Sequence, residues 1–301
     1  MPGVLSAEES AAIPLAAHAA LARYLAGEVS PEIALMHLLL IESEPQRLTK
    51  GLEALAAAAP ERREFAELLR LARALTESLA EAALLVRAGL AEDVGASGGI
   101  AAIRRQFDSA VATAPEAAVA LYSFGDAAIL DRATAEIVTR LHEWGLVGPD
   151  RTLLDIGCGI GRFERALAAS VASITAIDLS PGMIEEARRR CGELTNVGFL
   201  CCNGQNLDGF ADRSFDLVLA VDSFPYMIAV DPDIAARHVA EAARVLRRGG
   251  SLAILNFSYR GDLGQDRAEI GRLAAAYGFT VERAGTRDLA LWDGATFLLR
   301  R

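Results

Sequence analysis

The stretch from Thr152 to Phe163 reads TLLDIGCGIGRF. A short apolar run containing Asp155 leads into Gly157, Gly159 and Gly161, after which a helical pattern begins. This order predicts a buried strand, a tight turn and a helix, as in the first unit of an α/β fold. Because glycine has no side chain, such a turn lets a ligand approach the backbone. The stretch therefore indicates a site for a nucleoside-containing cofactor at the end of the strand.

Strand and helix patterns alternate from this stretch to the C-terminus. We expect strands at 152–156, 173–178, 197–201, 215–221, 250–257, 279–286 and 295–300, with helices at 161–170, 181–192, 233–247 and 264–277. Alternation of this kind predicts a Rossmann-like α/β fold, with a seven-stranded, mostly parallel sheet and helices on both faces. Ligands of such sheets bind at the C-terminal ends of the strands.

The first part of the chain has a helical period instead. Ser6 and Glu9 have the pattern of a capping box, Pro31 begins a second helix, and a third or fourth helical segment follows Pro60. These patterns predict an N-terminal α-helical bundle over 1–92. We expect it to cover the other domain as a lid or to form a homodimer, and the sequence does not separate these roles.

The middle of the chain joins the two parts. The stretch 91–99, AEDVGASGG, has the composition of a hinge, and 131–144 has an amphipathic helical period. We therefore expect a linker with helices over 93–148 and a catalytic domain over 149–301.

Composition excludes several classes of function. The net charge of −10 opposes binding to nucleic acid, which needs a basic surface. No apolar run approaches the ~20 residues of a membrane helix, and acids stand where a signal peptide carries positive charge. The four cysteines have no CxxC pairing and no companion histidines. We expect a cytoplasmic protein without a metal site, disulfides or a membrane partner.

The turn does not fit a nicotinamide dinucleotide, because that fingerprint requires a sixth-position glycine where this chain has Arg162. The pattern is DxGxGxG, and the acid Asp178 ends the second strand. A carboxylate there can accept two hydrogen bonds from ribose hydroxyls. Together these features indicate an adenosine site that needs no phosphate.

Residues 150–301 resemble the class I S-adenosylmethionine-dependent methyltransferases. The resemblance continues beyond the turn through IDLSPGMIEEARRR, NVGFLCCNGQNL, SFDLVLAVDSFPYM and RVLRRGGSLAILNFSYRGD, in that order. It implies that S-adenosylmethionine is the cofactor, that S-adenosylhomocysteine is the product, and that an O, N or C atom of a small molecule receives the methyl group.

The resemblance also assigns the cofactor site. The turn would line the methionine portion, Asp155 would orient the turn and the ammonium group, and Asp178 would hold the ribose. Leu179 and Met183 would lie against the adenine, and Asn203 replaces the aspartate that the family usually places at the adenine amino group. The full predicted set is Asp155, Gly157, Cys158, Gly159, Gly161, Asp178, Leu179, Met183, Asn203, Gly204, Gln205 and Asp222.

The acceptor side is expected beyond the fourth and fifth strands. Methyl transfer is a direct displacement, so the protein mainly aligns the nucleophile, and a base is needed only for a protonated one. We predict Asp222, Tyr226 and Tyr259 as catalytic residues, and Tyr122, Ser223, Tyr226 and Arg260 as substrate contacts. Two other functions stay open: a non-catalytic module that binds S-adenosylmethionine and, less favoured, an NAD-dependent oxidoreductase.

Overall fold

The computed structural model describes residues 5, 14, 17–89 and 98–301. The chain divides into two compact units. Unit 1 comprises Met1–Glu92, Ala112–Ala133 and Leu289–Asp293, and unit 2 comprises Asp93–Val111, Thr134–Asp288 and Gly294–Arg301. The segments 112–133 and 289–293 thus group with the N-terminal helices, although they lie far from them in sequence.

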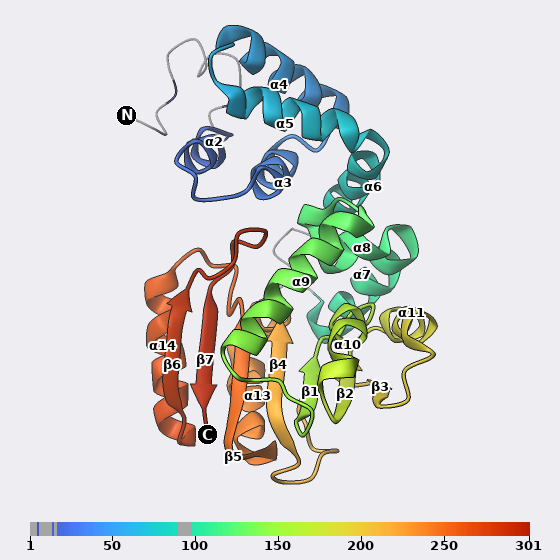
Figure 1. Ribbon diagram of the computed structural model, residues 1–301, viewed down its shortest axis with the longest axis vertical. Coiled ribbons are helices and arrows are strands. Elements are labelled where there is room, and N and C mark those ends of the chain that lie inside the picture. The colour runs from blue at the N-terminus through green and yellow to red at the C-terminus, as the bar shows by residue number, and fades with distance from the viewer. Residues whose placement is uncertain (1–4, 6–13, 15–16, 90–97) are drawn as a thin grey trace. The chain divides into compact units, whose positions relative to one another are not determined.

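Unit 1 is helical, which confirms the expected helical region ahead of the sheet. Its helices are α2 (His18–Leu25), α3 (Pro31–Ile41), α4 (Pro45–Ala58), α5 (Arg63–Ala74), α6 (Thr76–Arg87) and α8 (Pro115–Val119), with a 3₁₀ turn at Leu121–Ser123 (Figure 1). Ser30 caps α3 by accepting a hydrogen bond from the Ile33 amide at 3.3 Å. The segment after Pro60 is two helices that meet at Leu75. The capping box at Ser6 and Glu9 lies outside the described residues.

Two further helices connect the units along the chain. They are α7 (Gly99–Thr113) and α9 (Ala127–Glu143). Helix α9 begins four residues before the predicted start, because the Asp126 side chain accepts a hydrogen bond from the Ile129 amide at 2.9 Å and caps it. Most of the expected hinge at 91–99 lies outside the described residues.

Unit 2 is built on one seven-stranded sheet of order β3-β2-β1-β4-β5-β7-β6 (Figure 1). The strands are β1 (Thr152–Ile156), β2 (Ser173–Asp178), β3 (Val197–Cys201), β4 (Phe215–Val221), β5 (Leu246–Leu255), β6 (Thr280–Thr286) and β7 (Thr296–Arg300). The pairs among β1 to β5 are parallel, and β7 runs antiparallel to both β5 and β6. The predicted Rossmann-like fold is confirmed. Strand β5 begins four residues earlier than expected.

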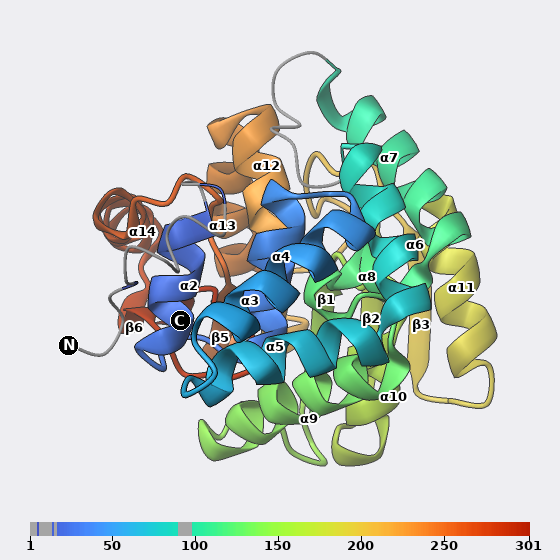
Figure 2. The same ribbon diagram turned by 90° about the horizontal axis from the view of Figure 1, so that it is seen from above.

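The helices of unit 2 cover both faces of the sheet. They are α10 (Arg162–Leu167), α11 (Pro181–Cys191), α12 (Phe224–Val230), α13 (Pro232–Val245) and α14 (Leu263–Tyr277). Helix α13 lies on the opposite face from α10 (Figure 2). Because both faces are covered, β1 and β4 are almost entirely buried, and Leu154, Val218 and Ile254 share a core with Val239 of α13. Helix α12 was not predicted.

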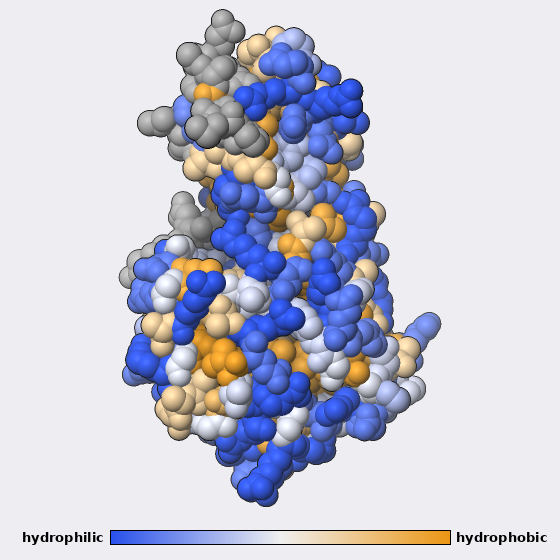
Figure 3. Space-filling model, turned by 60° about the vertical axis from the view of Figure 1, so that its left-hand side comes forward, coloured by the Kyte–Doolittle hydropathy of each residue, from blue (hydrophilic) through white to orange (hydrophobic). Residues whose placement is uncertain are grey.

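Hydrophilic residues cover most of the surface drawn in Figure 3, and hydrophobic residues form small groups between them. None of the helices in the described ranges is both long and apolar enough to cross a membrane.

Candidate functional site

The glycine turn follows β1, and its amides are used inside the protein. The amides of Gly157 and Cys158 both donate to the carbonyl of Ile177, at 2.8 and 3.0 Å. The Gly159 amide donates to Oδ2 of Asp178 at 2.9 Å. A phosphate-binding turn needs free N–H groups that point at the anion. This geometry therefore weighs against a pyrophosphate ligand and the oxidoreductase alternative.

Two glycines of the turn also permit close packing within the chain. Both have left-handed backbones, with φ of +81° at Gly157 and +79° at Gly161. A Cβ at Gly157 would lie 2.7 Å from Cβ of Ser223, and one at Gly161 would lie 2.9 Å from Sγ of Cys191 and 3.2 Å from Cβ of Ala187. The sequence suggested room for a ligand, whereas these contacts show that the turn needs both glycines to fit the β4 end and α11.

Two buried acids lie beneath the turn. Asp155 of β1 is 2% exposed, and Glu164 of α10 is fully buried and within hydrogen-bonding distance of it. Burial raises the pKa of Asp155 to about 7, against the opposing effects of Glu164 and Arg162. Burial and then the charge of Asp155 hold the pKa of Glu164 well above its usual value. Sequence reasoning missed Glu164, because an acid in a first helical turn is typical of an exposed position.

Asp178 is fixed at the end of β2 by two backbone amides. Its Oδ1 accepts from the Ser180 amide at 2.8 Å and its Oδ2 accepts from Gly159. Burial raises its pKa, and these hydrogen bonds act in the opposite direction. Each carboxylate oxygen can accept a second hydrogen bond, as a ribose contact requires.

A residue that the sequence did not single out supports this position. Asp108 of α7 accepts hydrogen bonds from the Ser180 hydroxyl at 2.5 Å and the Gly182 amide at 3.0 Å. It therefore holds the start of α11 directly after Asp178. No local pattern could have revealed it, because Asp108 lies more than seventy residues from its partners.

The expected adenine contacts are partly assembled. A Cβ at Gly204 would lie 3.4 Å from Cδ1 of Leu179 and 3.5 Å from Cγ2 of Ile100, so these residues form a small apolar group. Oδ1 of Asn203 accepts from the Gln205 amide at 2.8 Å. This hydrogen bond shapes the loop and leaves the oxygen one further lone pair for an adenine amino group. Ile100 was not predicted.

Two predicted cofactor contacts are closed off from solvent. Met183 is 1% exposed and Cys158 is 3% exposed. Burial raises the pKa of the Cys158 thiol well above its usual value, so this thiol is protonated at neutral pH. Both side chains therefore serve as packing beneath the site.

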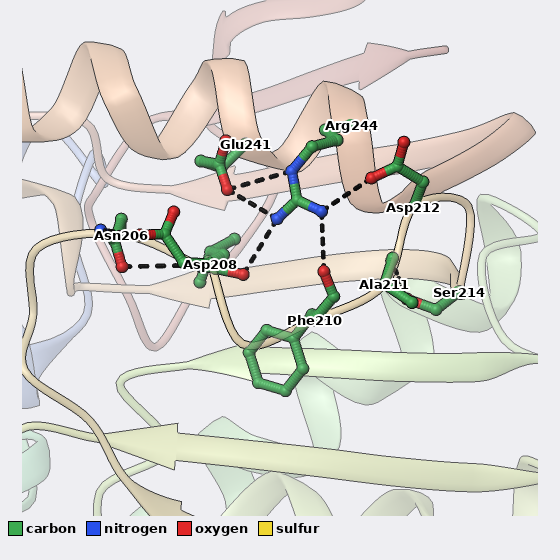
Figure 4. Close-up of polar contacts among 9 residues, drawn as sticks. Asn206, Asp208, Phe210, Ala211, Asp212, Ser214, Glu241 and Arg244 are labelled. Carbon is green, nitrogen blue, oxygen red and sulfur yellow. Dashed lines mark hydrogen bonds and ion pairs between the residues drawn. The ribbon is translucent and has the colours of Figure 1, made fainter.

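The loop between β3 and β4 is held by two arginines of α13 that sequence reasoning also missed. Arg237 donates to the carbonyl of Gln205 at 3.3 Å. Arg244 of α13 donates to the carbonyls of Leu207 and Phe210 at 3.0 and 2.7 Å, and it pairs with Asp212 and Glu241 (Figure 4). The other polar contacts drawn stay within the loop. Because the same loop carries Asn203 and Gly204, Arg237 and Arg244 together support the position of these residues.

The ends of β4 and β5 carry two residues in a left-handed backbone. Asp222 has a φ of 55° and Asn256 a φ of 73°. Nδ2 of Asn256 donates to Oδ1 of Asp222 at 3.0 Å, and the Tyr259 hydroxyl lies 3.5 Å from the same oxygen. Non-glycine residues held in this conformation concentrate at functional sites. Asn256 is thus a candidate site residue that the sequence pattern did not reveal.

Aromatic rings adjoin Asp222. Tyr226 contacts Phe107 and Tyr259 edge to face, at centroid distances of 5.0 and 5.7 Å. Burial and then the charge of Asp222 raise the pKa of Tyr226 to about 12, so its hydroxyl is protonated at neutral pH. At neutral pH the Tyr226 hydroxyl can therefore donate a hydrogen bond, but it is a poor base.

Two predicted substrate contacts, Arg260 and Tyr122, already have partners or are buried within the protein. Arg260 pairs with Asp266 at 2.6 Å and with Glu269 at 2.9 Å, so its charge is balanced before a substrate arrives. The nearby Asp262 caps α14 by accepting from the Gln265 amide at 2.9 Å. Tyr122 lies in unit 1 and is only 4% exposed. Both arrangements weigh against the predicted roles.

Within the described ranges, no group of three histidine, cysteine, aspartate or glutamate side chains could hold a metal ion. Oγ of Ser223 is buried and has no hydrogen-bond partner in the described part of the chain. This hydroxyl is available to a ligand at the end of β4.

Comparison with known proteins finds methyltransferases that are similar to part of unit 2. Residues 154–254 match the family model described as a methyltransferase domain. The demethylmenaquinone methyltransferase of Tropheryma whipplei is 36% identical over 107 residues, which are 36% of this chain and 42% of that protein. The 2-methyl-6-phytyl-1,4-hydroquinone methyltransferase of Synechocystis is 32% identical over 131 residues, which are 42% of this chain and 39% of that protein.

The chain spans less than half the length of these relatives. Among solved structures, a SAM-dependent methyltransferase from Aquifex aeolicus aligns with a TM-score of 0.44 and 22% identity, over 58% of this chain and 92% of that chain. A TM-score and a sequence identity this low do not identify a methyl acceptor.

Proposed function

Because the chain carries a class I S-adenosylmethionine-dependent methyltransferase domain, we propose that it transfers the methyl group of S-adenosylmethionine to an O, N or C atom of a small molecule. The observation that supports this best is the chemistry of the turn. The amides of its three glycines and of Cys158 donate to acceptors within the chain, and an acid is buried beneath it. A site of this kind favours a cationic, phosphate-free ligand over a nucleotide.

We propose that Asp178 binds the ribose hydroxyls, that the group of Leu179, Gly204 and Ile100 contacts the adenine, and that Asn203 meets its amino group. The bound cofactor supplies a methyl group on a sulfonium, which a nucleophile displaces directly. The protein then has to orient the acceptor and exclude water. Asp108 and Arg244 support this role indirectly, by fixing the start of α11 and the β3–β4 loop.

We place the acceptor at the ends of β4 and β5. Asp222 would orient its nucleophile and take up a proton where the nucleophile carries one. Tyr226 would donate a hydrogen bond, and the rings of Phe107 and Tyr259 would form an apolar wall. The strained backbones of Asp222 and Asn256 and the hydrogen bond between them support this placement.

The relatives do not fix the acceptor. The names of the two relatives above refer to demethylmenaquinone and to a phytyl hydroquinone. The name of a third, from Anoxybacillus flavithermus and 34% identical over 92 residues, refers to malonyl-[acyl-carrier protein]. We therefore propose no single acceptor. The aromatic side chains around Asp222 favour one with an apolar ring next to its nucleophile.

The role of unit 1 also stays a proposal. We propose that its helices cover the site or form a homodimer. Light scattering of the full chain over a range of concentrations tests the second role, since a mass that stays at one chain would contradict it.

Calorimetry with S-adenosylhomocysteine, followed by methyl-transfer assays on a panel of phenols, carboxylic acids and amines, tests the proposed function. We expect binding and turnover with at least one acceptor class. Absence of binding would contradict the proposal. Binding without turnover on any class would favour the non-catalytic module.

A further inference from the structure

The acids beneath the glycine turn are short of hydrogen-bond donors. When both are ionised, Oδ2 of Asp155 and both carboxylate oxygens of Glu164 have no partner in the described part of the chain. Asp155 is 2% exposed and Glu164 is 0% exposed, so bulk water cannot compensate. Two buried carboxylates in contact cannot both ionise at low cost. They require either a shared proton or a cation.

Nearby charged groups compensate this pair only in part. The charge of Arg162 acts on both acids, and its guanidinium also stacks on the Phe163 ring at 4.4 Å and lies 3.5 Å from the Thr134 hydroxyl. Asp178 of β2 adds a negative charge. The thiols of Cys158 and Cys191 are protonated, because burial and then Glu164 raise their pKa.

We propose that Glu164 joins Asp155 as the receptor of the donor's α-ammonium group, and that donor binding expels to solvent a proton held by the pair. This inference rests on the proposed function. It adds Glu164 to the proposed cofactor site and couples cofactor binding to the release of a proton. The ammonium takes the place of that proton as the positive charge between the carboxylates. Its N–H groups supply the donors that the orphaned oxygens lack.

The raised pKa values of both acids agree with this exchange. Burial raises the pKa of both acids and so favours a proton on the pair in the free protein, and the pKa of Asp155, about 7, lies near neutral pH. A bound cation favours the charged form of each acid and lowers its pKa. Binding therefore becomes tighter as pH rises through this range, by at most about tenfold per pH unit for one proton.

The direct test is calorimetry of the full chain with S-adenosylhomocysteine, which keeps the ammonium group, in phosphate and in Tris at pH 7. Different ionisation heats of the buffers give the number of protons released per ligand. We expect about half a proton or more, because the pKa of Asp155 lies near the working pH. We also expect the dissociation constant to fall several-fold from pH 6 to pH 7.

Two matched measurements distinguish a role of Glu164 in binding the ammonium group from a role in packing alone. In Glu164→Gln, residue 164 has no proton to release and Asp155 is the remaining buried acid of the pair, so proton release should fall below that of the unaltered protein and the pH dependence of affinity should weaken. In the unaltered protein, 5′-methylthioadenosine has the adenosine but no amino-acid group, so it should bind without releasing a proton. The second measurement does not depend on a variant that folds.

The outcomes also distinguish failure of the proposed function from failure of the proposed role of Glu164. If S-adenosylhomocysteine does not bind, the proposed function fails. If it binds without proton release, or if Glu164→Gln releases as many protons as the unaltered protein, the cofactor assignment stands and the role of Glu164 is refuted.

Discussion

Substituting Gly161 by alanine tests whether this glycine serves the packing of the turn. Its φ of +79° costs an alanine about 1–2 kcal/mol. The new Cβ would also lie 2.9 Å from Sγ of Cys191 and 3.2 Å from Cβ of Ala187. Overpacking of this kind costs about 1–3 kcal/mol. We therefore expect Gly161→Ala to lower the free energy of unfolding by about 2–5 kcal/mol.

Gly145→Ala is the matched control, because Gly145 has a similar φ of +66° but no neighbour within 4 Å of the added Cβ. It should lose only the backbone cost of about 1–2 kcal/mol. Both variants are compared by urea unfolding followed by circular dichroism at 222 nm, without ligand. Equal losses in the two variants would refute the packing argument and return Gly161 to the purely ligand-lining role that its sequence motif suggests.

The remaining predictions concern four other side chains. Asp178→Ala should weaken S-adenosylhomocysteine binding by about 1.5–3 kcal/mol in calorimetry, and unchanged affinity would exclude the ribose role. Asp222→Asn should lower kcat by about 100-fold or more on an acceptor that arrives protonated while the dissociation constant of the donor changes little; an unaltered kcat would show that Asp222 is not the base. Arg244→Met should weaken donor binding roughly tenfold, because the carbonyls of Leu207 and Phe210 lose their donor, while the exposed Arg248→Met should not; equal affinities would contradict the anchoring role. Glu164→Gln should raise the free energy of unfolding without ligand, and this gain should grow as pH rises above about 4.5. The folded protein raises the pKa of Glu164 above its unfolded value, so the unaltered protein loses stability as pH rises from there. A gain that is independent of pH would contradict this pKa.

The sheet could be predicted from the sequence because each strand is a short apolar run bounded by turn residues. Strands β1 to β4 have the expected bounds, and β5, β6 and β7 differ only at their ends. Helix α12 was not predicted, although it contains Pro225. In the structure Pro225 stands in the first helical turn, where a missing amide hydrogen costs nothing.

The candidate site was predictable where one local motif contains its parts. Gly157 and Asp178 stand in recognisable patterns, whereas Asp108, Arg244 and Asn256 act on residues that are distant in sequence. Glu164 shows the limit most clearly, since its charge suggests an exposed helix position and its burial depends on how α10 meets β1. The ion pairs of Arg260 could not be predicted for the same reason, because its partners come from α14, which the sequence alone could not place beside it.

A crystal structure of the full chain with S-adenosylhomocysteine tests the central claim most directly. We predict the ribose on Asp178, the adenine beside Leu179 and Gly204, the ammonium group at Asp155 and Glu164, and the sulfur directed toward Asp222. A ligand elsewhere on the chain, or one whose sulfur faces away from the ends of β4 and β5, would contradict the proposed methyl transfer.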